Sequence, residues 1–292
     1  MAGRHFRLVR IAIGLPDAVK WGMGFEKLFA ASPRRCIKWS SYFQVYEELL
    51  RRFRGQKVTL VEIGILDGGS LFMWREFLGP QARIIGIDLN PLCRELEKDG
   101  FEIFIGDQSS PIFWSEFFAK VGVVDVLIDD GGHTNLHQLV TLQASLEHIR
   151  DGGLILVEDV HASYMGQFGN PHRFSFINRC KQAIDEINAR CPAAGIEPTS
   201  FSRTVHSIAF YESIVAFQIN RPLCAVSVSL DNGGRPIRAD EQQTGGSREV
   251  PKGNPQTRSE GSFARRARDL YVRARTYARY RLENGRLGGY FR

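Results

Sequence analysis

The stretch that decides the fold reads Val124-Asp-Val-Leu-Ile-Asp-Asp-Gly-Gly-His133, and after a helix-length segment it continues as Gly152-Gly-Leu-Ile-Leu-Val-Glu-Asp-Val-His161. Two short β-branched runs, 123–128 and 154–157, flank one helical segment, which is the pattern of a βαβ unit in a parallel sheet. Each run ends in a pair of acidic residues. Because open α/β sheets bind their ligands at the carboxyl ends of the strands, this unit predicts both the fold class and the place of the site.

Four carboxylates would lie together at this edge of the sheet, those of Asp129, Asp130, Glu158 and Asp159. They repel one another unless a cation lies between them, and a divalent cation with oxygen ligands is the simplest one. His133, one turn beyond Asp130, is a titratable neighbour. Either acid pair alone is better explained by a helix cap or a turn. Acid pairs at the ends of two strands, one of them followed by Gly-Gly-His, favour a metal site.

Composition places the chain among ordinary globular proteins. Its 292 residues, 43% hydrophobic and 24% charged, suffice for one large α/β domain with extensions. No run of about 18 apolar residues is present, and the apolar run 11–15 is too short for a signal-peptide core, so we expect a cytoplasmic protein. The five cysteines are odd in number and lack Cys-x-x-Cys spacing, which indicates reduced thiols and neither disulfides nor a zinc site.

Four segments follow from the pattern along the chain: an N-terminal extension at 1–37, the main domain at 38–220, a flexible linker at 221–260 and an Arg-rich amphipathic helix at 261–292. The last segment holds nine arginines and two acidic residues, a charge of 9 − 2 = +7, so the rest of the chain sums to about −1 of the total +6. Such a helix suits an anionic membrane surface or an acidic partner, and docking on its own protein explains it equally well. Nucleic acid is not the expected partner.

A glycine-rich loop follows the first predicted strand, 58–63, and leads into a helix that begins near residue 70. Its glycines let the backbone approach a ligand closely, and the start of the helix offers free N–H groups to a nucleotide-like cofactor. The next strand, 83–87, ends in Asp88, about 20 residues after the loop, where an acid accepts hydrogen bonds from ribose hydroxyls. The third strand, 101–105, ends in polar residues that could read an adenine edge. The predicted cofactor-binding residues are Glu62, Gly64, Gly68, Ser70, Asp88, Asp107 and Gln108.

NAD(P) and S-adenosylmethionine both suit such a crevice. The dinucleotide fingerprint needs a second glycine to admit a pyrophosphate, and here Gly64 is followed by Ile65 and Leu66. Glu62 would repel a phosphate but attract an amino group and a sulfonium. The sequence therefore favours S-adenosylmethionine.

The remaining pattern predicts an amphipathic helix at 42–53, a helix at 174–189, and two strands at 205–210 and 214–219 that form an antiparallel hairpin. A parallel sheet that ends in a hairpin differs from the usual end of a dinucleotide dehydrogenase.

Together these motifs resemble the metal-dependent class I methyltransferases that methylate sugar hydroxyls of macrolide antibiotics, whose relatives carry the label cephalosporin hydroxylase. The resemblance covers about Lys38 to Asn220, roughly the length of one domain. The motifs that carry it are Glu62-Ile-Gly, Gly68-Gly69-Ser70, Gly106-Asp107-Gln108, Asp129-Asp130-Gly-Gly-His133 with His137-Gln138, Glu158-Asp159-Val-His161 with Ser163-Tyr164, and the hairpin from Ser207 to Val215.

The resemblance implies a seven-stranded Rossmann-like sheet, S-adenosylmethionine as methyl donor, and Mg²⁺ held by Asp130, Glu158 and Asp159, with His133 as general base. The implied acceptor is a sugar-containing small molecule, such as a glycosylated natural product, or a glycan, and we expect a homo-oligomer. His161 and Tyr164, just past the second acid pair, are predicted to contact the acceptor. The family's usual Thr-Asp-Lys entry to the first helix reads Cys36-Ile37-Lys38 here.

Two other interpretations remain open at this point. An oxygenase, as the relatives' label suggests, would need iron held by two histidines and one carboxylate, whereas the predicted set here is three carboxylates. A non-catalytic module would keep the crevice without chemistry and use the Arg-rich segment to bind a membrane or a polyanion.

Overall fold

The computed structural model describes residues 24–168, 174–191, 197–225 and 227–237, together with Leu270, Tyr271, Ala274 and Arg275. The chain divides into two units after Ile237, and the first of them holds the sheet. The four described residues of the second unit are helical. The rest of the predicted Arg-rich helix, residues 238–260 of the predicted linker and residues 1–23 of the predicted extension lie outside the described residues.

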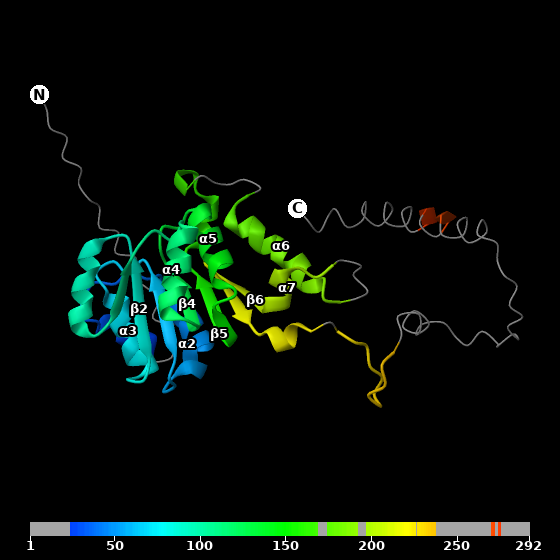
Figure 1. The fold of residues 1–292 in the computed structure, drawn as a ribbon, viewed down its shortest axis with the longest axis horizontal. Coiled ribbons are helices and arrows are strands. Elements are labelled where there is room, and N and C mark those ends of the chain that lie inside the picture. The colour runs from blue at the N-terminus through cyan, green and yellow to red at the C-terminus, as the bar shows by residue number, and fades with distance from the viewer. Residues whose placement is uncertain are drawn as a thin grey trace, which may run out of the picture. The chain divides into compact units, whose positions relative to one another are not determined.

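The first unit is built on a seven-stranded sheet with the strand order β3-β2-β1-β4-β5-β7-β6 (Figure 1). Neighbours from β3 to β5 pair in parallel, and β7 pairs antiparallel with both β5 and β6. The predicted mostly parallel sheet that ends in a hairpin is confirmed. The strands are β1 (Thr59–Ile63), β2 (Arg83–Asp88), β3 (Glu102–Ile105), β4 (Val124–Asp129), β5 (Ile149–Val157), β6 (Val205–Tyr211) and β7 (Ile214–Ile219).

Helices cover both faces of this sheet, because the central strands bury their side chains on both sides. Leu60, Val126 and Leu156 point to the core beneath α1, α2 and α3, whereas Val61, Leu127 and Ile155 point to the core beneath α4, α5 and α6 (Figure 1). The α-helices are α1 (Phe25–Ala30), α2 (Tyr42–Leu50), α3 (Gly69–Leu78), α4 (Pro111–Val121), α5 (Asn135–Ser145), α6 (Phe176–Asn188) and α7 (Ser200–Thr204). The 3₁₀ helices are η1 (Arg51–Phe53), η2 (Pro91–Asp99), η3 (Val160–Tyr164), η4 (Gly166–Phe168) and η6 (Arg221–Cys224). Among the described residues, none of the helices combines the length and the apolar character needed to span a bilayer.

At both ends, the folded domain extends beyond residues 38–220, the range that the sequence motifs cover. Helix α1 precedes Lys38, yet Phe25 on it is 2% exposed and its ring lies 4.0 Å from that of Phe77 and 5.5 Å from that of Tyr46. At the other end, the guanidinium of Arg221 donates hydrogen bonds to the backbone oxygens of Ile149 and Leu146. Helix α1 and Arg221 are therefore packed on the sheet domain, whereas most of residues 227–237 are exposed.

Phe25→Ala tests whether α1 belongs to this core. We expect the substitution to lower the free energy of unfolding by about 3–5 kcal/mol, the usual cost of removing a buried aromatic ring. Leu92→Ala, at a side chain that is 71% exposed, is the control and should change it by less than about 0.5 kcal/mol. Urea denaturation followed by circular dichroism measures both, and equal small losses would show that α1 is not part of the core.

Candidate functional site

The register of the sheet brings the ends of its central strands together. Ile63 pairs with Asp129 and Asp129 pairs with Val157, so β1, β4 and β5 end side by side. One residue further on, the amide of Asp130 donates to the backbone oxygen of Ile63, and the amide of Glu158 donates to that of Asp129. The acid pairs that lie 28 residues apart in the sequence, from Asp130 to Glu158, therefore meet at one edge of the sheet.

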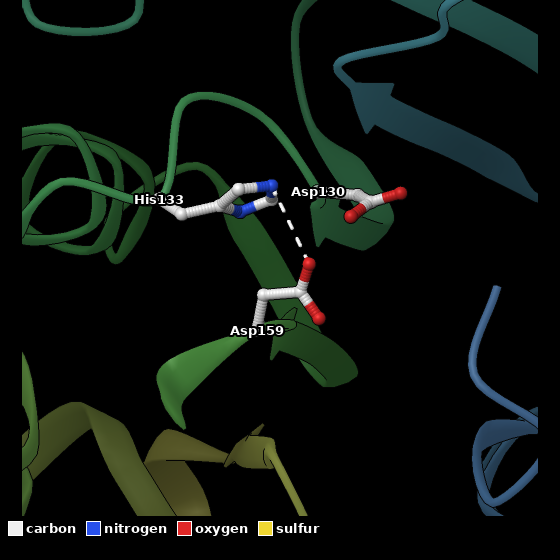
Figure 2. Close-up of side chains that lie close together, drawn as sticks. All are labelled: Asp130, His133 and Asp159. Atoms are coloured by element: carbon white, nitrogen blue, oxygen red, sulfur yellow. Dashed lines mark ion pairs between the residues drawn. The ribbon is translucent and has the colours of Figure 1, made fainter. Parts of the chain in front are cut away.

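Asp130, His133 and Asp159 form what we call the outer group (Figure 2). Each offers one ligand atom, and these atoms lie within 4.8 Å of one another. The imidazole Nε2 of His133 is 3.4 Å from Oδ2 of Asp159. His133 and Asp159 have φ angles of +55° and +53°, a left-handed backbone that costs energy for residues other than glycine and is concentrated at functional sites. The loops after β4 and β5 are thus bent so that these side chains face each other.

Behind the outer group, the ammonium of Lys38 lies among three carboxylates, which we call the inner group: Glu62, Asp130 and Glu158. Its Nζ is 3.1 Å from Oε1 of Glu62, 2.7 Å from Oδ2 of Asp130 and 3.0 Å from Oε2 of Glu158. The Lys38 side chain is 1% exposed. Asp130 belongs to both groups. Because Lys38 contacts Asp130 as well as Glu62, it connects the end of β1 to the outer group.

Three aromatic residues near Lys38 also donate hydrogen bonds to these acids. The hydroxyl of Tyr46 donates to Oε1 of Glu158 at 2.6 Å, and that of Tyr42 donates to Oδ1 of Asp159 at 2.6 Å. The indole of Trp39 donates to the same oxygen at 3.1 Å. Because Tyr42 and Tyr46 are one turn apart on α2, a single helix supports both members of the second acid pair.

Burial and charge shift the pKa values of the inner group. Burial alone would lower the pKa of Lys38, but the facing carboxylates, Asp130 and Glu158 foremost, outweigh it and hold the pKa well above its ordinary value. Burial raises the pKa of Glu158 to about 8, although the neighbouring Lys38 ammonium opposes the rise. Burial likewise raises the pKa of Glu62 against the opposing effects of Lys38 and Ser70. The ammonium therefore stays charged, whereas burial favours the protonated forms of Glu158 and Glu62.

A crevice runs along the same edge as two adjoining cavities, of about 350 Å³ and 230 Å³, that share Gly64, Asp88 and Gly131. The larger contains the outer group, and the smaller reaches Asp107 and Gln108. Gly64 has φ +79°, and a Cβ there would lie 2.1 Å from the backbone oxygen of Asp130. Only glycine fits this close crossing of the two loops.

Five of the residues predicted for the cofactor line this crevice, namely Gly64, Ser70, Asp88, Asp107 and Gln108. The Gln108 side chain, however, donates to Asp129 and Thr141 and accepts from the amide of Gly132. Its amide group is therefore occupied in holding the loop after β4, and the predicted reading of an adenine edge is not the role its contacts indicate.

Two other predicted cofactor residues lie outside the lining of the crevice. Gly68 turns the chain at φ +84° against Leu96, where a Cβ would meet a side-chain carbon at 2.5 Å. Glu62 is fully buried, and its carboxylate accepts from Lys38 and from the hydroxyl of Ser70. Lys38 and Ser70 therefore already occupy the Glu62 carboxylate. An amino group of the cofactor could bind it directly only by displacing one of these two donors.

The predicted acceptor contacts, His161 and Tyr164, both lie on η3 directly after Asp159. The ring of His161 is 5.8 Å from that of Trp39, edge to face, and its Nδ1 is hydrogen-bonded to the hydroxyl of Ser213. Tyr164 is 59% exposed. His161 thus lies beside Asp159, with its Nδ1 3.9 Å from Oδ1, whereas Tyr164 is open to solvent and neither residue lines the two cavities.

Sequence reasoning did not assign a role to Lys38, Tyr42 or Tyr46. Lys38 is the one residue kept from the family's Thr-Asp-Lys pattern. Its retention could have indicated a role in the site. The two tyrosines lie on the apolar stripe of a predicted amphipathic helix, where nothing in the sequence separates a core aromatic from one that also donates a hydrogen bond.

Glu158 makes stability depend on pH. Its pKa is about 8 in the folded protein, against an ordinary value of 4.5, so the folded state binds more protons between these values. Stability should therefore fall as pH rises from about 4.5 to 8, by at most about 1.4 kcal/mol per pH unit for one proton.

Glu158→Gln keeps an acceptor for Tyr46 and should reduce this slope, whereas Glu95→Gln, at an exposed position, should leave it unchanged. Urea unfolding in EDTA at pH 5.5, 6.5 and 7.5 measures it. Parallel pH profiles for the wild type and Glu158→Gln would contradict the assignment.

No family model matches the chain, but proteins of known activity do. Demethylmacrocin O-methyltransferase of Streptomyces fradiae is 34% identical over 142 residues, which cover 45% of this chain and 35% of that protein. The 2′-O-methyltransferase of 8-demethyl-8-α-L-rhamnosyl tetracenomycin C from Streptomyces olivaceus is 30% identical over 192 residues, covering 61% and 50%. The chain thus spans half or less of the length of these relatives.

Solved structures agree with the sequence matches. The MycE methyltransferase from the mycinamycin biosynthetic pathway, in complex with Mg, S-adenosylhomocysteine and mycinamycin VI, has a TM-score of 0.59 and 27% identity, covering 68% of this chain and 53% of that one. The resemblance found in the sequence is confirmed. This chain is a homologue of the sugar O-methyltransferases of macrolide and tetracenomycin pathways, and it has their Rossmann-like methyltransferase fold.

Proposed function

We propose that the protein is an S-adenosylmethionine-dependent, Mg²⁺-assisted O-methyltransferase that methylates a hydroxyl of a sugar or a glycosylated natural product. The observation that carries the proposal is the outer group, in which Asp130, His133 and Asp159 present ligand atoms within 4.8 Å of one another. This group lines the same cavity as Gly64 and Asp88, so a methyl donor and a metal-bound hydroxyl would meet there.

The crevice suits the methyl donor. Asp88, at the end of β2, lies where an acid accepts from ribose hydroxyls in sheets of this kind, and Asp107 lines the smaller cavity. The negative side chains of the larger cavity attract a sulfonium. The similar MycE structure contains S-adenosylhomocysteine, which supports the same choice of cofactor here.

Asp130 and Asp159 have the arrangement expected of ligands for Mg²⁺, which prefers oxygen donors and an incompletely protein-bound shell. One oxygen of each carboxylate is fixed by a protein donor: Lys38 binds Oδ2 of Asp130, and Tyr42 binds Oδ1 of Asp159. Such outer donors orient metal ligands, and the second oxygen of each acid remains for the ion. When bound, the cation lowers the pKa of a coordinated hydroxyl and so makes it a better nucleophile.

Glu158, expected from the sequence as a third ligand, has a different place in this proposal. Both of its oxygens already accept hydrogen bonds, one from Tyr46 and one from Lys38, and it is fully buried. We therefore assign it to the support of Lys38 and Asp130.

His133 is the proposed general base. Its Nε2 lies beside Asp159, which can stabilise the imidazolium that forms when the ring takes the hydroxyl proton. An acceptor held between the outer group and η3 would contact His161 and Tyr164, and the names of the relatives indicate a sugar as that acceptor. One histidine with two carboxylates also differs from the two-histidine, one-carboxylate set of iron oxygenases, so the outer group favours methyl transfer.

Asp130→Asn and Asp159→Asn test the metal site. Each should weaken Mn²⁺ binding by about 100-fold or more, beyond the 10–100-fold typical of residues that only support a ligand, while S-adenosylhomocysteine still binds. Isothermal titration calorimetry measures both ligands, and Asp185→Asn on the exposed face of α6 is the matched control.

Methyl transfer from labelled S-adenosylmethionine should disappear with the same two variants and with EDTA. Demethylmacrocin, mycinamicin VI and the rhamnosyl tetracenomycin of the relatives are the acceptors to assay. Full turnover in EDTA would refute metal assistance.

His133→Ala should slow methyl transfer by about 10²–10⁴-fold, the usual contribution of a general base, while Mn²⁺ affinity stays within a few-fold of the wild type. Single-turnover kinetics and calorimetry on the same preparation separate the two effects. A loss of Mn²⁺ binding as large as that of Asp130→Asn would instead make His133 a metal ligand.

A further inference from the structure

The loop 130–133, which carries two members of the outer group, contains two consecutive glycines whose amides are both held by side chains. The amide of Gly131 donates to Oδ1 of Asp129 at 3.2 Å, and the amide of Gly132 donates to Oε1 of Gln108 at 2.7 Å. Both of these side chains are buried. The loop is therefore fixed from beneath by polar groups that are withdrawn from solvent.

Gln108 joins this loop to the helices that cover the sheet. Its Nε2 donates to Oδ1 of Asp129 at 2.9 Å and to the hydroxyl of Thr141 on α5 at 3.1 Å. Its backbone oxygen accepts from the indole of Trp114 on α4 at 2.8 Å. Thr141 and Trp114 are buried as well. Breaking such a network is costly, because the groups left behind would be buried without partners.

The two glycines follow from the same packing. A Cβ on Gly131 would lie 2.0 Å from Oε1 of Gln108, and one on Gly132 would lie 2.1 Å from Nδ1 of His137. The loop passes so close to these side chains that neither position has room for a side chain of its own. A change at Gln108 would therefore reach the loop through direct contact.

We propose that Gln108 is a positioning residue of the reaction, which fixes the loop so that Asp130 can bind the metal ion while His133 faces the acceptor hydroxyl. The inference rests on the proposed function for the roles of Asp130 and His133. Gln108 lines the smaller cavity, but both polar atoms of its side chain are engaged in the network. It therefore acts on the reaction through the loop, where a misplacement of about 1 Å can cost about 10²-fold in rate.

Gln108→Met tests this role, because methionine has a similar length but no amide group. Single-turnover methyl transfer should slow by about 10–100-fold, the usual effect of losing a group that orients functional residues. Calorimetry should find the affinity for S-adenosylhomocysteine within a few-fold of the wild type. A loss of that affinity as large as the loss of rate would overturn the proposal, since it would show that Gln108 binds the cofactor.

A second set of variants lies outside the crevice. Thr141 lines neither cavity, so an effect of Thr141→Val on the rate would reach the site through Gln108. We expect this variant to slow methyl transfer by a smaller factor than Gln108→Met does, and Thr141→Ser, which keeps the hydroxyl, to have the wild-type rate. Equal rates for Thr141→Val and the wild type would contradict the network.

Ser145→Ala is the matched control for Thr141→Val. Ser145 is also fully buried on α5, but its hydroxyl donates to the backbone oxygens of Thr141 and Leu142 within its own helix. The variant should therefore lose a buried hydroxyl without slowing methyl transfer.

Hydrogen exchange supplies a readout that does not depend on activity. The amides of Gly131 and Gly132 should exchange faster in Gln108→Met and in Thr141→Val than in the wild type, because the groups that hold them are loosened or gone. Ser145→Ala should leave their exchange unchanged. Mass spectrometry of a peptide that contains residues 130–133 measures it, and unchanged exchange in Gln108→Met would refute the positioning role.

The two proposals fail separately in these experiments. A wild type without methyl transfer counts against the proposed function, whereas the exchange of the loop amides decides whether Gln108 holds the loop. If Gln108→Met does not fold, the two Thr141 variants and Ser145→Ala carry the same comparison of rates and exchange.

Discussion

The neutralisation of buried carboxylates is the constraint on which this structure depends. A parallel sheet collects the ends of β1, β4 and β5 at one edge, and this chain places an acid at each of them. Charges in such a position are costly unless a cation pairs with them. Lys38 supplies that cation from outside the sheet, with three carboxylate contacts of 2.7–3.1 Å. The packing of the segment before α2 is thus tied to the geometry of the site.

Two residues of helix α2 belong both to the hydrophobic core and to the site. Tyr46 is fully buried and packs against Trp74 and Phe25, while its hydroxyl holds Glu158. Tyr42 is 1% exposed and holds Asp159. A shift of α2 would therefore move the hydroxyl groups that donate to Asp159 and to Glu158 at the same time. Helix α1 does not line the crevice, yet it affects the site because Phe25 packs in the core on which α2 rests.

Sequence patterns were sufficient for the sheet and for the place of the acids, because strand period, glycine turns and the parallel βαβ rule act locally. They placed Asp130, His133 and Asp159 at one edge, as the structure has them. They failed on the direction of side chains whose partners are distant in the chain. Glu158 turns toward Lys38, 120 residues away, and Gln108 turns toward Asp129 and Thr141. No local period specifies such pairings.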